Sequence, residues 1–206
     1  MATKTKKVRQ AGFERKTSET DIKVKFKVDG TGKSKVTTGV PFLDHMLEGF
    51  SKHGLFDIDV NAKGDIHIDI HHTNEDVAIC LGKALHKSLN EKKGIRRYGF
   101  FILPMDEALV QVALDISDRP SFHYKMDRSV KLTERKNAYL VNDAREFFKT
   151  FSQHAGINMN LSIQEGTDPH HVIEAVFKST AKALDMATQI DARIKGVPST
   201  KGTLKE

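Results

Sequence analysis

Asp69-Ile70-His71-His72-Thr73-Asn74-Glu75-Asp76 is the stretch that decides the fold of this chain, because its pattern occurs a second time. The second copy, Asp168-Pro169-His170-His171-Val172-Ile173-Glu174-Ala175, is shifted by 99 residues, from position 71 to position 170. Both copies read His-His-x-x-Glu, and both are followed at the same distance by Lys-Ala-Leu, at 83–85 and 182–184. Two copies in register indicate an internally duplicated chain that carries a pair of metal-binding units.

The duplication extends beyond these two stretches. Residues 48–54 (EGFSKHG) align with residues 149–155 (KTFSQHA) at an offset of 101, so helix, strand, motif and helix follow in the same order twice. The simplest architecture is an α+β fold of two similar halves, with helices packed on one sheet face. We expect a first half at 1–94, including a tail at 1–8, a second half at 95–195 and a C-terminal tail at 196–206. Together they form one compact catalytic unit.

Hydrophobic periodicity predicts the elements of each half. Residues 20–29 alternate apolar and charged, which is typical of a strand with one buried face. The charged stretch 127–142 predicts a long loop. Further strands are predicted at 7–15, 34–38, 56–61, 66–69, 98–103, 108–115, 121–126 and 158–163. Helices are predicted from Pro41 to about residue 52, from about 73 through Leu85, and over 143–155 and 171–189.

Composition narrows the class of protein. The net charge is +6, and the densest basic cluster, at Lys4, Lys6, Lys7 and Arg9, is typical of a solvated tail. The absence of tryptophan argues against base-stacking nucleic-acid recognition. No apolar stretch approaches the roughly 18 residues of a membrane-spanning helix. The single cysteine, Cys80, lies in an apolar run and suits a reducing compartment. We therefore expect a soluble cytoplasmic protein without a membrane or nucleic-acid partner.

Helix geometry divides the six motif residues. Positions i and i+4 share a helix face, whereas i+1 lies about 100° around it. His71 and Glu75 can therefore hold one ion while His72 points elsewhere, and the second copy repeats this arrangement with His170, Glu174 and His171. Two facing copies can build two sites, each from one His-Glu pair and the lone histidine of the other copy.

The donor types restrict the metal. Imidazole and carboxylate ligands suit Mn²⁺, Fe²⁺, Zn²⁺ or Co²⁺. The carboxylate oxygens among them favour a larger coordination number, and therefore Mn²⁺ or Fe²⁺ over tetrahedral Zn²⁺. The alternative is that each motif caps a helix N-terminus, where Glu75 would complement the helix dipole. Capping explains one motif as well as metal binding does, but it does not explain a matched pair.

Short motifs in a fixed order give the chain a family resemblance. They include Arg15-Lys16-Thr17-Ser18-Glu19-Thr20, Pro41-Phe42-Leu43-Asp44-His45, Arg97-Tyr98-Gly99, Pro104-Met105-Asp106-Glu107, Asp115-Ile116-Ser117-Asp118-Arg119-Pro120 and Pro198-Ser199-Thr200-Lys201-Gly202. With the twin motif, they make the chain similar to the imidazoleglycerol-phosphate dehydratase family, from Arg15 to Lys201. The resemblance implies a ribosomal-S5-like fold and loss of water from imidazole glycerol phosphate, giving imidazole acetol phosphate in histidine biosynthesis. It also implies two Mn²⁺ ions per active site and a homo-oligomer of 24 subunits, with active sites at subunit interfaces.

The resemblance also implies residue roles. One metal would be held by His45, His72, His170 and Glu174, and the other by His71, Glu75, His171 and the residue at position 146. Glu19 matches the proposed acid/base, so the catalytic set is Glu19, His71, Glu75 and His171. Substrate, chiefly its phosphate, would be bound by Glu19, Arg97, Arg119, Lys178, Ser199 and Lys201.

The chain departs from the family pattern at two positions. The family commonly has histidine where Glu146 and Asn160 stand here. We predict that Glu146 replaces the imidazole as a ligand and shifts the preference of its site towards Mn²⁺ or Mg²⁺. The alternative is that Glu146 is a surface residue and water is the fourth ligand. We expect Asn160 to lie outside the ligand set.

Two other functions are compatible with parts of this pattern. A non-catalytic metal-dependent shell protein could keep the fold, but it would not need the phosphate-binding residues. A basic nucleic-acid-binding protein would need a cationic strand face, and only Lys23, Lys25 and Lys27 supply one.

Overall fold

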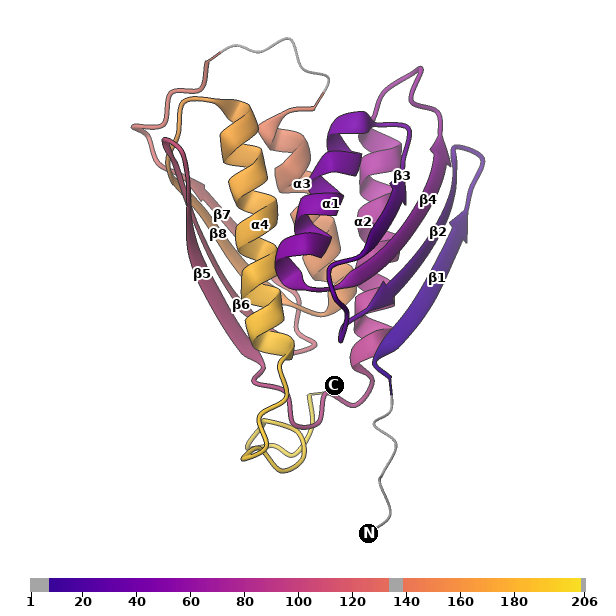
Figure 1. Cartoon of the computed structure of the whole chain (residues 1–206), viewed down its shortest axis with the longest axis vertical. Coiled ribbons are helices and arrows are strands. Elements are labelled where there is room, and N and C mark those ends of the chain that lie inside the picture. The colour runs from indigo at the N-terminus through magenta and orange to yellow at the C-terminus, as the bar shows by residue number, and fades with distance from the viewer. Residues whose placement is uncertain (1–7, 134–138, 205–206) are drawn as a thin grey trace.

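In the part of the chain that the structure describes, two four-stranded sheets lie on the outside and four helices lie between them (Figure 1). The computed structural model describes residues 8–133 and 139–204. The first half contains β1 (Gln10–Lys16), β2 (Thr20–Lys27), β3 (Ser34–Thr37), α1 (Pro41–Gly54), β4 (Asp57–Gly64) and α2 (His71–Leu89). The second half contains β5 (Tyr98–Met105), β6 (Ala108–Asp115), β7 (Ser121–Met126), α3 (Val141–Ala155), β8 (Asn158–Glu165) and α4 (Pro169–Thr188).

The two halves have the same topology. The strand orders are β1-β2-β4-β3 and β5-β6-β8-β7, and each half contains one parallel pair, β3 with β4 or β7 with β8. A helix connects the two strands of each parallel pair, as a parallel connection requires. The predicted α+β fold of two similar halves is therefore confirmed.

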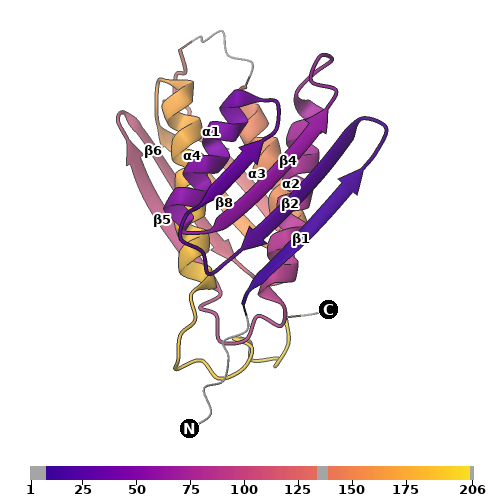
Figure 2. The ribbon, with the colours of Figure 1, turned by 45° about the vertical axis from the view of Figure 1, so that its right-hand side comes forward.

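Strand periodicity places the core between the sheets. On β2, Ile22, Val24 and Phe26 are buried, whereas Lys23 and Lys25 point to solvent. Figure 2 shows β1, β2 and β4 in front of the helices that their apolar faces cover. Cys80 is also in the core, and its burial raises the pKa of its thiol to about 12. The apolar run of the sequence in which Cys80 lies is therefore part of the core.

Each helix packs against a helix of the other half. α1 contacts α4, and α2 contacts α3. Gly82 makes the second contact close, because a Cβ atom at that position would lie 2.7 Å from the carbonyl oxygen of Phe151. Helices of both halves therefore meet along two seams, and the motif residues lie on helices that form them.

The expected strand at 66–69 is wrong. β4 ends at Gly64, and the next residues form a turn in which the backbone N–H of Ile68 donates to the Asp65 carbonyl at 2.8 Å. Ile66 and Ile68 alternate like strand residues, but 41% and 70% of their surfaces remain exposed. Gly64 packs against Thr73 so closely that a Cβ atom there would lie 2.1 Å from its hydroxyl oxygen. The end of β4 therefore packs directly on the first turn of α2.

Several predicted boundaries also move. α2 begins at His71 instead of about residue 73, and α3 begins at Val141 instead of 143. Residues 127–133 contain no strand or helix, as predicted, whereas 134–138 of that loop lie outside the described residues. The same holds for Lys4, Lys6 and Lys7 of the basic tail. Arg9 is not free, because it donates to Asp29 and to the carbonyl of Thr188.

No helix among the described residues is long and apolar enough to cross a membrane.

Candidate functional site

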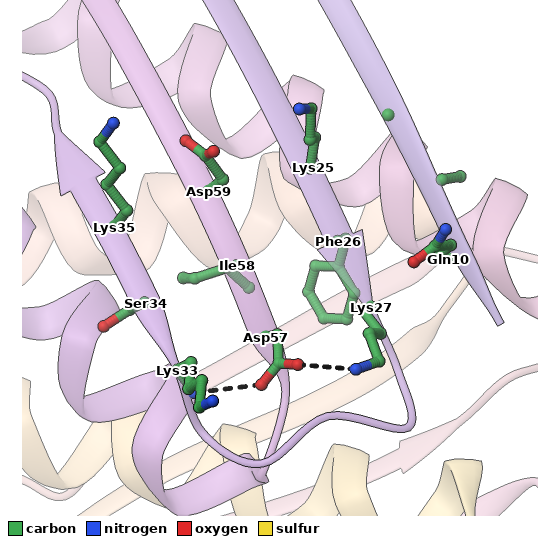
Figure 3. Close-up of a pocket in the computed structure, with 12 residues that line it drawn as sticks. Gln10, Lys25, Phe26, Lys27, Lys33, Ser34, Lys35, Asp57, Ile58 and Asp59 are labelled. Atoms are coloured by element: carbon green, nitrogen blue, oxygen red, sulfur yellow. Dashed lines mark hydrogen bonds and ion pairs between the residues drawn. The ribbon is translucent and has the colours of Figure 1, made fainter. Parts of the chain in front are cut away.

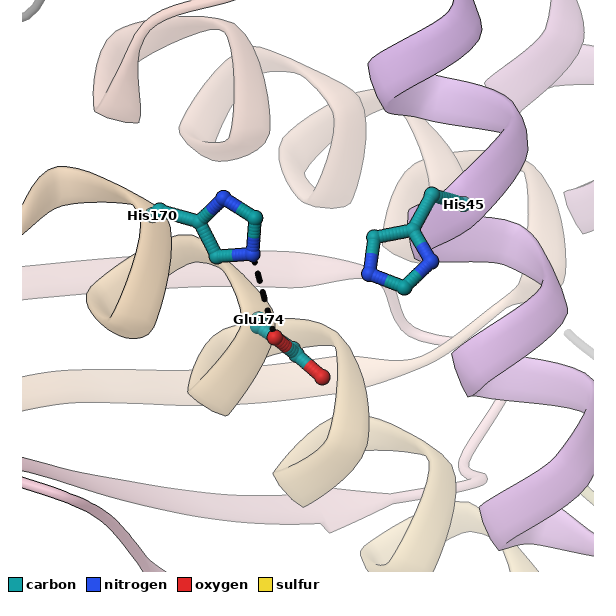
Figure 4. Close-up of side chains that lie close together, drawn as sticks. All are labelled: His45, His170 and Glu174. Atoms are coloured by element: carbon teal, nitrogen blue, oxygen red, sulfur yellow. Dashed lines mark ion pairs between the residues drawn. The ribbon is translucent and has the colours of Figure 1, made fainter.

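The ends of two helices bring three potential metal ligands together. His45 of α1 and His170 and Glu174 of α4 offer donor atoms that all lie within 4.8 Å of one another (Figure 4). His170 Nε2 is 3.3 Å from Glu174 Oε2, which is the i, i+4 pairing predicted from helix geometry. Among the residues that the structure describes, this is the one group of at least three His, Cys, Asp or Glu donors that converges in this way.

The charge of Glu174 suits a ligand. Burial, the largest single effect, acts to raise its pKa, but the hydrogen bond from Lys178, whose Nζ lies 2.6 Å from Oε1, and the charges of Lys178, His45 and His170 together lower the pKa overall. Glu174 is therefore ionised at neutral pH. Asp168 fixes the start of α4, since its carboxylate accepts the backbone N–H of His170 at 2.8 Å. These contacts hold both α4 donors in place beside His45.

His171 points away from this cluster, as predicted for position i+1. Its Nδ1 lies 2.7 Å from Glu107 Oε2, and its Nε2 lies 3.5 Å from Asp106 Oδ2. Glu107 also accepts backbone N–H groups of Thr167 and Asp168, and the Asp168 bond is the largest cause of its lowered pKa. The hydrogen bond that His171 donates to Glu107 raises the pKa of His171. The turn between β5 and β6 thus sets the orientation of His171.

The first motif has different surroundings. His72 Nδ1 lies 3.0 Å from Asp65 Oδ2 and 3.8 Å from Glu19 Oε2, and the Asp65 hydrogen bond raises its pKa. His71 and Glu75 are exposed. Within the described residues, these side chains join no cluster of three donors. The structure therefore assembles three of the eight predicted ligands and places His72 beside the predicted acid/base, Glu19.

Glu146 occupies the position of α3 that corresponds to His45 of α1, at the offset of 101 found in the sequence. Its carboxylate lies 3.0 Å from Lys149 Nζ and 3.7 Å from Arg145 Nη1. Asn160 lies exposed on β8, on the sheet face that points away from the helices, since its neighbours Met159 and Leu161 are buried.

Glu19 sits in the turn between β1 and β2. Its backbone N–H donates to Thr17 Oγ1 at 3.1 Å, and the neighbouring Thr20 hydroxyl donates to Asp76. Arg15 Nε donates to the other oxygen of Asp76 at 2.7 Å. The turn is therefore fastened to α2 directly after Glu75. This network was not predicted, although Arg15, Thr20 and Asp76 all lie within the quoted motifs.

Four of the predicted substrate-binding residues surround one cavity. Its volume is about 540 Å³, and its lining includes Arg97, Arg119, Ser199 and Lys201. Arg97 is fixed there, because Nε and Nη2 donate to the two oxygens of Asp115 at 2.6 and 2.9 Å, and Nη1 donates to the Pro198 carbonyl. Three cations around one cavity suit a phosphate group. The other two predicted residues are elsewhere, Lys178 at the metal-ligand cluster and Glu19 beside His72.

A cavity of about 700 Å³ on the outer face of the first sheet contains none of the predicted site residues (Figure 3). Asp57 faces Lys27 Nζ at 2.9 Å and accepts the backbone N–H groups of Thr31 and Lys33. Burial acts to raise the pKa of Asp57, but these hydrogen bonds, led by Thr31, lower it to about 2. The carboxylate therefore holds the turn before β3.

Comparisons with known proteins agree on one family. A sequence model of imidazoleglycerol-phosphate dehydratase matches residues 38–184. The enzymes of that name from a Geobacillus species and Bacillus subtilis are 50% and 49% identical over 197 residues, covering 96% of this chain and 100% of each relative.

Solved structures of the same name share the fold. The Staphylococcus aureus crystal structure superposes with a TM-score of 0.77 at 31% identity, covering 88% of this chain and 99% of that one. The Pyrococcus furiosus structure gives 0.76 at 34% identity, covering 93% and 99%. The chain therefore belongs to the imidazoleglycerol-phosphate dehydratase family.

Proposed function

We propose that this hydro-lyase removes water from imidazole glycerol phosphate, giving imidazole acetol phosphate in histidine biosynthesis, with two Mn²⁺ ions per active site. The observation that carries the proposal is the convergence of His45, His170 and Glu174 within 4.8 Å, in a chain about half identical to named dehydratases.

The donor set fits a divalent metal. Two imidazoles and an ionised carboxylate suit Mn²⁺ and its neighbours in the first transition row. Three protein donors leave coordination positions for a further ligand and for substrate. We assign the further ligand to His72 of a neighbouring subunit, because His72 of the same chain is not among the donors that converge within 4.8 Å. The second set would contain His71, Glu75, His171 and Glu146.

This assignment requires a homo-oligomer with active sites between subunits. We expect the assembly to contain 24 subunits and the protein to be cytoplasmic. The exposed apolar side chains of Tyr98, Phe100 and Ile102 on β5 provide surface for such contacts. The mass of the native assembly, measured with and without added Mn²⁺, tests this part of the proposal. A monomer that binds two ions would contradict it.

The reaction breaks two bonds of the substrate. The hydroxyl leaves the carbon attached to the imidazole ring, a proton leaves the next carbon, and a double bond forms between them; the resulting enol then becomes the ketone. Bound divalent metals would favour the anionic form of the ring and stabilise developing charge. Arg97, Arg119, Ser199 and Lys201 would hold the phosphate. Glu19, which the β1–β2 turn presents beside His72, would accept and return the proton.

One assay tests the proposal. Purified protein is incubated with Mn²⁺ and imidazole glycerol phosphate, and formation of the product is followed through the absorbance of its enol. We expect turnover that a chelator abolishes and Mn²⁺ restores. Absence of product with every divalent metal tried would contradict the dehydratase activity and favour a shell protein without catalysis.

A further inference from the structure

A buried lysine that belongs to none of the quoted motifs forms an ion pair with Asp118, to which no role has been assigned so far. Lys92, in the segment between α2 and β5, is 2% exposed. Its Nζ donates to both carboxylate oxygens of Asp118 at 2.7 Å. His86 Nε2, near the end of α2, lies 2.9 Å from the same Asp118 carboxylate and 3.4 Å from Lys92 Nζ. A lysine buried to this degree needs its counter-ion, because a lone charge is costly to remove from water.

The pair fixes the loop between β6 and β7. Asp118 has a positive φ of 59°, which is uncommon for a residue with a side chain, and its backbone N–H donates to the Gly156 carbonyl at 2.9 Å. A Cβ atom at Gly156 would lie 2.6 Å from Asp118 Oδ1, so the approach depends on glycine. Asp118 is thus held at both its backbone and its side chain. The next residue is Arg119, which lines the cavity of about 540 Å³.

The same pair lies under the C-terminal segment. A smaller cavity of about 190 Å³ is lined by Lys92 and Asp118 together with Val197, Thr203 and Leu204. Leu204 is 5% exposed and lines the larger cavity as well. The N–H of Gly94, two residues after Lys92, donates to the Gly196 carbonyl at 2.8 Å, just before the segment that carries Ser199 and Lys201.

We propose that Lys92 and Asp118 are positioning residues for the phosphate of the substrate. Neither lines the cavity of about 540 Å³, but together they hold the loop that presents Arg119 and support the segment that presents Ser199 and Lys201. Ordering cationic side chains before binding spares the entropy of ordering them on binding. The inference rests on the proposed function in assigning this cavity to phosphate.

The test separates the two ends of the substrate. Inorganic phosphate probes the cationic cavity, and imidazole probes the metal end. In the Lys92→Met variant, we expect the inhibition constant of phosphate and the KM of substrate to rise about tenfold. The inhibition constant of imidazole and kcat are expected to stay within about twofold, with metal content unchanged. Lys92→Arg, which keeps the charge, should restore most of the phosphate affinity.

Lys27→Met is the matched control, since it breaks the ion pair with Asp57 on the outer sheet face, and it should leave both inhibition constants unchanged. Asp118→Asn keeps the side-chain shape but removes the charge that pairs with Lys92. This variant replaces Lys92→Met in the test if Lys92→Met does not fold. An unchanged phosphate constant, or equal weakening of phosphate and imidazole, would overturn the proposal. Phosphate binding measured by calorimetry needs no turnover, so failure of the dehydratase assay remains distinguishable from failure of this inference.

Discussion

The two His-His-x-x-Glu motifs share one sequence pattern but meet different partners. On α4, His170 and Glu174 lie beside His45 of α1, and the three donor groups converge. The corresponding His71 and Glu75 are on α2, which packs against α3, and α3 carries Glu146 where α1 carries His45. The spacing within a motif thus determines which residues share a helix face. The packed helix determines whether a third donor joins them.

Neighbouring charges explain part of the difference. Lys149 Nζ lies 3.0 Å from the Glu146 carboxylate, one helical turn further along α3. At the position of Lys149, the first half has Glu48 on α1. The acidic residue and the basic residue of α3 therefore neutralise each other. A metal at Glu146 would compete with Lys149 for the carboxylate.

Removing a donor of the assembled cluster should have the largest effect. We expect Glu174→Gln to lose one metal ion per chain and to lower kcat about a thousandfold, or about 4 kcal/mol of transition-state stabilisation. Metal analysis and steady-state kinetics measure both. Glu48→Gln, an exposed change on α1, is the control. Full metal content with normal turnover in Glu174→Gln would show that the cluster is not a metal site.

Changing Glu146, the residue of the other half that corresponds to His45, should have a smaller effect. Glu146→Ala is expected to lose the second metal and to reduce kcat about a hundredfold. Glu146→His, which makes this position identical to His45, should retain both ions. If metal stoichiometry and turnover are unchanged in Glu146→Ala, Glu146 is not a ligand.

The two halves also differ at the first residue of a corresponding strand, which is the charged Asp57 in β4 and the neutral Asn158 in β8. Replacing Asp57 by asparagine therefore makes the first half like the second at this position. The pKa of Asp57 is about 2, below its ordinary value of 3.8, so its contribution is complete above pH 4 and is lost as pH falls towards 2. We expect Asp57→Asn to lower the free energy of unfolding by about 1 kcal/mol at pH 7, less than the whole shift implies, because solvent screens a partly exposed carboxylate.

Denaturant unfolding at fixed protein concentration, repeated from pH 7 to pH 2, measures this difference. The curves of the two proteins should converge as pH falls. A difference that persists at pH 2 would mean that the ionised carboxylate is not its source.

The smallest expected effect comes from releasing Glu146. In Lys149→Met, the carboxylate no longer has its cation one turn away, so the dissociation constant of the second metal should fall about threefold. Titration calorimetry with Mn²⁺ measures it. Lys182→Met, which removes another lysine at i, i+3 from an acidic residue, should leave this constant unchanged. Weaker binding in Lys149→Met would argue that Lys149 positions Glu146 for the metal.

Periodic features were predictable from the sequence. The alternation in β2 and the i, i+4 pairing of His170 with Glu174 follow from backbone geometry, and both were predicted correctly. The alternation at 66–69 predicted a strand wrongly, because Ile66 and Ile68 have the spacing of strand residues but lie exposed in a turn.

Contacts between distant residues were not predictable in this way. Lys92 and Asp118 are 26 positions apart and belong to no periodic pattern. Their pairing depends on how the segment after α2 packs against the loop after β6. The same applies to His72, because its contact with Asp65 depends on the turn that precedes α2.

The helix seams make the two halves interdependent as fragments. α1 packs on α4 and α2 on α3, so a chain cut between Leu89 and Tyr98 would leave each fragment with two helices whose partners are on the other. His45 would be on one fragment, and His170 and Glu174 on the other. Reassociation of the fragments would rebuild the three-donor cluster along with the core. Recovery of metal binding would then report fragment complementation directly.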